Sequence, residues 1–219
     1  MIPRGIAVLW EQRDAMLSGL LTTIGITIVA AICAGLLGLV VFSLLISRIR
    51  AIEVTLVWLI DLMRCVPFML FCYLIYYGLP SVGIVVGNLT AGITALTIYN
   101  AAYIAELLRG GYEGLPREGI EAGHAFGFHG WRLLARIILP PVLLSAIPMF
   151  GNQMIQIIKD SAFLVIIAVQ ELTFAANEIQ ATYYVPFASF VCAMLLYWLL
   201  CLGVETGVRA VLALAERRR

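Results

Sequence analysis

Residues 15–47 contain no charged side chain. A helix needs about 20 apolar residues to cross a bilayer, so this run is long enough to cross and to tilt or project beyond it. The whole chain has the same character: 63% of its residues are hydrophobic and 12% are charged, about half the charge of a soluble domain. The mean hydropathy is +1.01. These features predict an integral membrane protein.

Apolar segments separated by charges and turn residues predict an all-α protein with five transmembrane helices. We expect residues 1–219 to form a single transmembrane domain. The second span should end at the turn signal Gly78-Leu79-Pro80, the third at Gly110-Gly111, and the last should continue as a helical tail to Leu214. The spans are predicted at about residues 17–46, 52–77, 89–108, 137–158 and 187–204.

Basic residues predict the orientation, because arginine and lysine are enriched on the cytoplasmic side. The connection at residues 78–88 has no charge, and residues 161–186 hold Glu171 and Glu178 but no basic residue. The basic residues fall in the alternate connections. We therefore expect the N-terminus outside and the C-terminus in the cytoplasm, with these residues on the cytoplasmic side: Arg48, Arg50, Arg109, Arg117, Arg132, Arg136, Arg209 and Arg217-Arg218-Arg219.

The central connection, about residues 110–136, is the most polar part of the chain. Residues 113–130 should form a short helix bounded by glycines, with Pro116 as an early residue. Arg132 and Arg136 lie four apart and can reach the lipid headgroups from one helix face. His124 and His129 are too few to hold a metal ion, so no metal site is predicted.

The order of residues in this loop resembles the cytoplasmic EAA signature of binding-protein-dependent ABC importer permeases. Glu121-Ala122-Gly123 is followed by Gly127, Ile137 and Leu139-Pro140 at the family's spacing, and the only departure is Gly123, where the family usually has a second alanine.

Two flanking stretches resemble the polar amino-acid branch of that family. DLMRCVPFMLFCYLIYYGLP (residues 61–80) is similar to its "RGTP…YYGLP" block, with Cys65-Val66 in place of Gly-Thr. GNQMIQIIKDSAFLVIIAVQELT (residues 151–173) is similar to its "KDTSL…ELT" stretch, with Ser161-Ala162 in place of Thr-Ser. AAYIAELLRGG (residues 101–111) looks like the end of the family's third span.

The resemblance implies a permease subunit of the bacterial inner membrane whose coupling helix docks in a groove of an ATPase subunit. Small residues in the loop would permit close approach, and Phe126 and Phe128 would be rigid aromatic anchors. The expected partners are two ABC ATPase subunits, a second identical or homologous permease, a periplasmic or surface amino-acid-binding protein and membrane lipid. The coupling residues implied are Glu121, Ala122, Gly123, Gly127, Ile137, Leu139 and Pro140.

The chain contains no Gly-rich phosphate-binding loop that ends in Gly-Lys-Ser/Thr. It is therefore expected not to be an enzyme and to hold no cofactor, with ATP and Mg²⁺ bound by the partner subunits. A net charge of +1 gives no basic field for nucleic acid.

Charges inside a membrane are costly and are functional candidates. Structural ion pairs are favoured where opposite charges lie three or four residues apart on a helix. These pairs are Asp61–Arg64, Glu106–Arg109 and Glu205–Arg209.

The fourth span carries a polar stripe, Asn152, Gln156 and Asp160, on a helix that also contains Pro140, Pro141 and Pro148. The uncharged residues 161–169 that follow suggest a broken or re-entrant element, where transporters hold polar substrates. Adjacent Lys159 and Asp160 could receive the two charges of an amino-acid zwitterion. The alternatives are a mutually neutralised pair or a boundary at the outer surface.

In the family resemblance, Lys159 and Asp160 match positions that line the substrate pocket. Asn100, Pro67 and Phe68 match neighbouring positions, and Gln156 joins this candidate site through the polar stripe. Ala101 stands where some relatives have a glutamate, which argues against a cationic cargo side chain.

Two other functions compete with this interpretation. A small secondary transporter driven by an ion gradient would need no ATPase-docking element. An integral-membrane enzyme would need clustered histidine, cysteine or carboxylate side chains, and the sequence shows none at a membrane face.

Overall fold

The computed structural model describes residues 2–47 and 49–216, which are helical with no strand. Four continuous helical segments are long and apolar enough to cross a membrane, and the bent pair α3–α4 would make a fifth. The predicted all-α class is confirmed. The helices are α1 (Ile2–Glu11), α2 (Arg13–Leu45), α3 (Arg50–Cys65), α4 (Phe68–Ser81), α5 (Asn88–Glu113), α6 (Arg117–Ala125), α7 (Gly130–Leu133), α8 (Leu139–Ser161), α9 (Leu172–Tyr183) and α10 (Pro186–Glu216).

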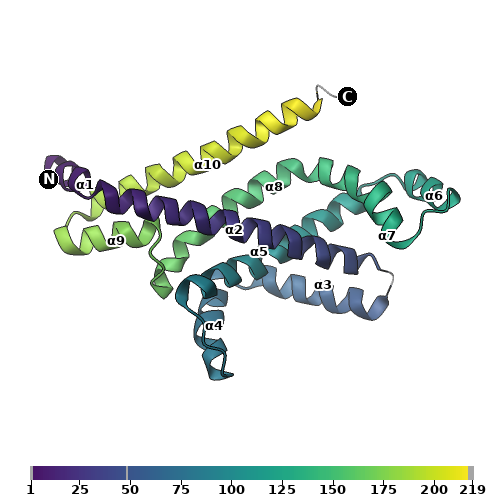
Figure 1. The fold of residues 1–219 in the computed structure, drawn as a ribbon, viewed down its shortest axis with the longest axis horizontal. Helices are drawn as coiled ribbons and strands as arrows, with labels where there is room; N and C mark the ends of the chain where they lie inside the picture. The colour runs from purple at the N-terminus through teal and green to yellow at the C-terminus, as the bar shows by residue number, and fades with distance from the viewer. Residues whose placement is uncertain (1, 48, 217–219) are drawn as a thin grey trace.

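Helices α2 and α5 form the centre of the bundle (Figure 1). Helix α2 has 33 residues, or roughly 50 Å at 1.5 Å per residue, so it exceeds the bilayer core as expected. Its contact face carries small residues four apart, Ala30, Ala34 and Gly38, all buried. A Cβ on Gly38 would lie 2.7 Å from Cγ2 of Ile104 in α5. Small residues thus bring the two backbones together, as is typical of membrane helix pairs.

The predicted second span, residues 52–77, is wrong as a single helix. Helices α3 and α4 meet at 106°, and α4 projects from the side of the bundle in Figure 1. Val66 has an extended backbone, with φ −88° and ψ 134°, because the residue before a proline avoids the helical region. Pro67 also lacks the N–H that would continue the helix. Helix α4 then runs past Gly78 to Ser81, with Pro80 inside it.

Two tyrosines of α5 satisfy backbone carbonyls near this break. The hydroxyl of Tyr99 donates to the carbonyl of Val66 at 3.0 Å, and that of Tyr103 donates to the carbonyl of Arg64 at 3.3 Å. A helix broken inside a membrane needs such partners because lipid offers none.

The remaining spans differ from expectation mainly at their ends. Helix α5 continues through Gly110-Gly111 to Glu113, and α10 is one continuous helix over the predicted span and its tail. A π-helical turn, Leu134–Ile138, precedes α8. After α8 the chain makes a 3₁₀ turn, Ala162–Ile167, and then α9 begins. A broken element therefore follows Asp160, as the sequence predicted.

Of the cytoplasmic arginines, Arg109 lies near the C-terminal end of α5, Arg117 in α6 and Arg132 in α7. These parts of the chain lie at one end of the molecule, whereas α1 and α9 lie at the opposite end (Figure 1). Arg48 and residues 217–219, which also entered the orientation argument, lie outside the described residues. The direction in which the bundle crosses the membrane stays a prediction.

Candidate functional site

The helix predicted at residues 113–130 is shorter in the structure: α6 covers Arg117–Ala125, and Gly127 ends it. The amide of Phe128 donates to the carbonyl of Gly123, and that of Gly127 donates to the carbonyl of His124, each at 3.0 Å. This pair of bonds is a Schellman motif, which requires a left-handed residue after the helix. Gly127 supplies it with φ +80°. Pro116 is the residue before the first turn, close to its expected place.

Gly123 faces the inside of the protein rather than a partner. It is buried, and a Cβ there would lie 2.9 Å from Cδ1 of Leu133 and 3.4 Å from Cγ1 of Ile137. Gly123, one of the small residues of the loop, is therefore packed within the permease and is not exposed for close approach by a partner. Glycine at this position lets α6 pack against the turn that leads into α8.

On the side of α6 toward its C-terminal end, the exposed residues include Glu121 and Ala122 of the helix and Phe126 and Gly127, which follow it. The side chain of Phe126 is 83% exposed. Phe128, the second expected aromatic anchor, instead packs against the buried cluster that contains Leu133. The later signature positions follow in the π turn and α8: Ile137 and Leu139 are half-buried and Pro140 is exposed. Of the two predicted anchors, only Phe126 is available to a partner.

The histidines of the loop contact each other, with 3.1 Å between their Nδ1 atoms. They belong to the lining of a cavity of about 490 Å³ between α6, α7 and the ends of α2 and α5. No group of three or more potential metal-ligating side chains occurs among residues 2–47 and 49–216.

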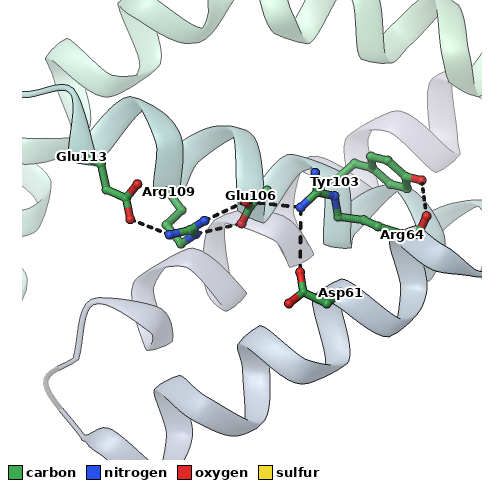
Figure 2. A network of polar contacts seen from close by, with 6 residues as sticks. All are labelled: Asp61, Arg64, Tyr103, Glu106, Arg109 and Glu113. Atoms are coloured by element: carbon green, nitrogen blue, oxygen red, sulfur yellow. Dashed lines mark hydrogen bonds and ion pairs between the residues drawn. The ribbon is translucent and has the colours of Figure 1, made fainter.

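Two predicted ion pairs merge into one ladder between α3 and α5 (Figure 2). Glu106 accepts two hydrogen bonds from Arg109, at 2.7 and 2.8 Å, and also lies 3.3 Å from Nη1 of Arg64. Asp61 extends the ladder at 3.9 Å from Arg64, and Glu113 extends it beyond Arg109. Glu106 therefore joins the helix before the break to the central helix. The pair Glu205–Arg209 forms on α10, at 2.6 Å.

A second polar cluster lies buried between α5 and α8. Asn100 is fully buried, and Asp160 and Gln153 are 3% and 8% exposed. Nε2 of Gln153 donates to Oδ1 of Asn100 at 2.6 Å, and Nε2 of Gln156 donates to Oδ1 of Asp160 at 2.8 Å. The side chain of Asn100 lies close to the Asp160 carboxylate, but its hydrogen bonds go to the carbonyl of Leu96 and to Gln153. Oδ2 of Asp160 is buried and has no hydrogen-bond partner among the described residues.

Lys159 and Asp160 do not point to the same place. Successive helical residues differ by about 100° in direction. Asp160 faces α5, whereas Lys159 is exposed on the side of Cys201 in α10. No ion pair joins Lys159 to Asp160 in the described part of the chain. Mutual neutralisation within this pair is therefore not what the structure contains.

The other candidate residues are divided by the break in the second span. Phe68 is buried and packs edge-on against Tyr99, the neighbour of Asn100, with 5.2 Å between ring centroids. Pro67 is exposed at the start of α4. Phe68 therefore borders the buried cluster, whereas Pro67 acts on it only by ending α3.

The three residues of the polar stripe of α8 do not all face the protein core. Residues four apart drift by about 40° around a helix, so Asn152 and Asp160 are separated by about 80°. Asn152 and Gln156 are exposed, whereas Asp160 is buried. Gln153 lies seven residues before Asp160, about two turns, and shares its buried face. A seven-residue spacing was the signal in the sequence that would have identified Gln153.

Residues 40–213 match the family described as binding-protein-dependent transport system inner membrane component. The chain belongs to this family. The resemblance inferred from the sequence is thereby confirmed, together with the class of function that it implied.

Relatives cover almost the whole chain. The probable glutamine ABC transporter permease protein GlnM of Bacillus subtilis (strain 168) is 28% identical over 207 residues, which are 93% of this chain and 94% of that protein. The glutamine transport system permease protein GlnP of Escherichia coli (strain K12) is 32% identical over 183 residues, 80% of this chain and 81% of that one.

Solved structures show the same fold. The crystal structure of an amino acid ABC transporter with histidines has a TM-score of 0.84 and 28% identity, covering 96% of this chain and 97% of that one. An inward-facing methionine ABC transporter, MetNI, has a TM-score of 0.74 at 22% identity, covering 91% and 97% of the two chains. The second likeness concerns the fold alone.

Proposed function

We propose that this chain is the permease subunit of an ATP-driven importer for polar amino acids, and that Asp160 receives the ammonium group of the cargo. The observation that carries the cargo site is the buried Oδ2 of Asp160, which lacks a partner among the described residues. A buried carboxylate oxygen without a hydrogen bond is costly. A cargo ammonium would supply both the missing donor and the opposite charge.

The surroundings of Asp160 support an amino acid as the cargo. Asn100 offers an amide beside the carboxylate, and Phe68 and Tyr99 form an aromatic wall next to Asn100. Relatives named as permeases for glutamine support a polar, uncharged side chain. Ala101 adds no negative charge next to Asn100, which favours an uncharged over a cationic cargo side chain.

The proposed partners follow from what the chain lacks and what it exposes. Two ATPase subunits would bind ATP and Mg²⁺ and would dock against the exposed surface of α6 through Phe126. A second permease subunit, identical or homologous, would complete the path, and an external binding protein would deliver the cargo. Exposed apolar side chains on α2 and α10 would contact lipid.

We place α6 in the cytoplasm and α9 outside, from the distribution of arginines. Glu118 and Glu178 are exposed on these two helices, which lie at opposite ends of the molecule (Figure 1). In a background without the native cysteines, Glu118→Cys should react with a membrane-impermeant thiol reagent only from the cytoplasmic side. Glu178→Cys should react only from outside. The reverse labelling would refute the orientation.

Uptake into vesicles tests the proposed function. The permease reconstituted with its partner subunits should accumulate a labelled polar amino acid when ATP is present at the ATPase side and no ion gradient exists. ATP hydrolysis should be required, because the energy enters through the ATPase subunits. Uptake driven by an ion gradient without ATP would instead establish the alternative, a small secondary transporter.

A further inference from the structure

We infer that Gln153 is a positioning residue for the cargo: it orients the amide of Asn100 so that an N–H group is presented to the cargo carboxylate. The inference rests on the proposed function, in which Asp160 receives the ammonium group. Gln153 is nine-tenths buried and comes from α8, whereas Asn100 comes from α5. Their hydrogen bond is 2.6 Å long and joins the two helices that enclose the site.

The orientation of both amides follows from one backbone group. Nδ2 of Asn100 donates to the carbonyl of Leu96 at 2.9 Å. A carbonyl only accepts hydrogen bonds, so the nitrogen of Asn100 must face Leu96 and the oxygen must face Gln153. Gln153 must then present its own nitrogen, as observed. The two hydrogen bonds therefore run in one direction, from Gln153 to Asn100 and from Asn100 to the carbonyl of Leu96. Reversing either amide would place two acceptors against each other.

This direction leaves Asn100 with one N–H for the site. An amide nitrogen carries two hydrogens, and the carbonyl of Leu96 takes one of them. Asn100 and Asp160 are neighbouring buried side chains, so a donor and a negatively charged acceptor lie side by side. The carboxylate and ammonium groups of an amino acid are neighbours in the same way. We therefore assign Asn100 as the donor to the α-carboxylate.

Gln156 provides the contrast with Gln153. Gln156 is exposed and donates directly to Asp160, so its amide can rotate or exchange partners with water. Gln153 has its amide held in the protein interior. Gln153 and the carbonyl of Leu96 therefore together hold the Asn100 amide in one orientation, whereas Gln156 forms no hydrogen bond with it in the described residues.

The test compares Gln153→Glu with Gln153→Met in the reconstituted complex. Glutamate keeps the size of glutamine, but in its ionised form it has no N–H and sets an oxygen against Oδ1 of Asn100. We expect the cargo concentration for half-maximal uptake to rise about tenfold or more at neutral pH, while the ATPase subunits stay bound.

Lowering the pH distinguishes positioning from packing. Once protonated, the carboxyl introduced by Gln153→Glu can donate its O–H to Asn100, so this variant should recover affinity toward that of the wild type measured at the same pH. Gln153→Met fills similar space without a donor and should stay defective at every pH. Wild-type affinity in the methionine variant, or a defect of the Gln153→Glu variant that does not respond to pH, would overturn the inference.

Asp160→Asn, measured alongside, separates this inference from the proposed function. Normal cargo affinity in both Gln153 variants with a severe defect in Asp160→Asn would refute the role of Gln153 and leave the cargo site standing. Normal affinity in Asp160→Asn would refute the cargo site itself.

Discussion

Replacing Gly127 with valine is expected to release the ATPase subunits from a permease that still inserts and folds. Gly127 has φ +80°, a region that β-branched residues rarely adopt. The left-handed conformation costs a residue with a side chain roughly 1–2 kcal/mol. The end of α6 should therefore unwind and displace Phe126, the exposed anchor. The cost is local because nothing lies within 4 Å of a Cβ on Gly127.

Gly119 provides a matched control within the same helix. It lies in α6, is exposed, and has no atom within 4 Å of the place that a Cβ would take, but its backbone is helical. Gly119→Ala should leave co-purification of the ATPase subunits with a tagged permease intact and stabilise α6 slightly. Normal co-purification and coupled transport in Gly127→Val would contradict the docking role of the helix end.

A charge reversal at Glu121 tests the same surface without backbone strain. Glu121 is exposed and forms no ion pair within the described residues, so Glu121→Lys should not disturb the fold of the permease. If Glu121 meets a basic group of the ATPase, the lysine should weaken assembly, and added salt should lessen the difference. Unchanged assembly would remove Glu121 from the docking surface.

Local signals in the sequence predicted that a helix forms here, but they placed its ends too far apart, at residues 113 and 130 rather than Arg117 and Ala125. Pro116 and Gly127 act through their own backbone preferences, so their effects do not depend on the rest of the fold. Gly123 is different, because glycine is required there by the close packing of Leu133, which lies on a neighbouring turn. Only the folded chain reveals that this glycine is used internally, and the aromatic Phe128 was misjudged for the same reason.

The break in the second span could not be detected from hydropathy. Residues on both sides of Pro67 are apolar, so a window average joins α3 and α4 into one apparent helix. The signal was present in Val66-Pro67, because a β-branched residue before proline strongly favours an extended backbone. The 106° angle could not be predicted, since the residues that contact the chain at the break, Tyr99 and Tyr103, lie on α5, far away in the sequence.

Helical geometry also explains which part of the cargo site the sequence missed. The polar residues of α8 were correctly assigned to one helix. However, side chains four residues apart do not point in the same direction, because each step of four rotates the side chain about 40° around the helix axis. Asp160 was found because it is charged, whereas Gln153 was not found because its partner, Asn100, lies 53 positions away in the chain.

The second large effect is expected at Asp160. Asp160→Asn keeps the size of the side chain and removes its charge, so it should remove a charge-assisted hydrogen bond of about 1.5–3 kcal/mol. Cargo binding should weaken on the order of tenfold to a hundredfold, while the ATPase subunits stay bound. Lys159→Met should have a smaller effect because Lys159 is exposed and faces α10.

The double variant Lys159→Met/Asp160→Asn excludes a simple alternative. If the two residues only neutralised each other, removing both charges would be tolerated much better than removing one. Because they point in different directions, we expect the double variant to be as defective in uptake as Asp160→Asn alone. Recovery of uptake in the double variant would mean that Asp160 serves charge balance rather than cargo.

The most direct measurement is equilibrium binding of a labelled polar amino acid to the purified complex, with wild-type permease and with Asp160→Asn. The wild-type complex should bind the amino acid, and the Asp160→Asn complex, carrying its full complement of ATPase subunits, should bind it at least about tenfold more weakly. Equal binding by the two complexes would contradict the assignment of Asp160 as the residue that holds the cargo.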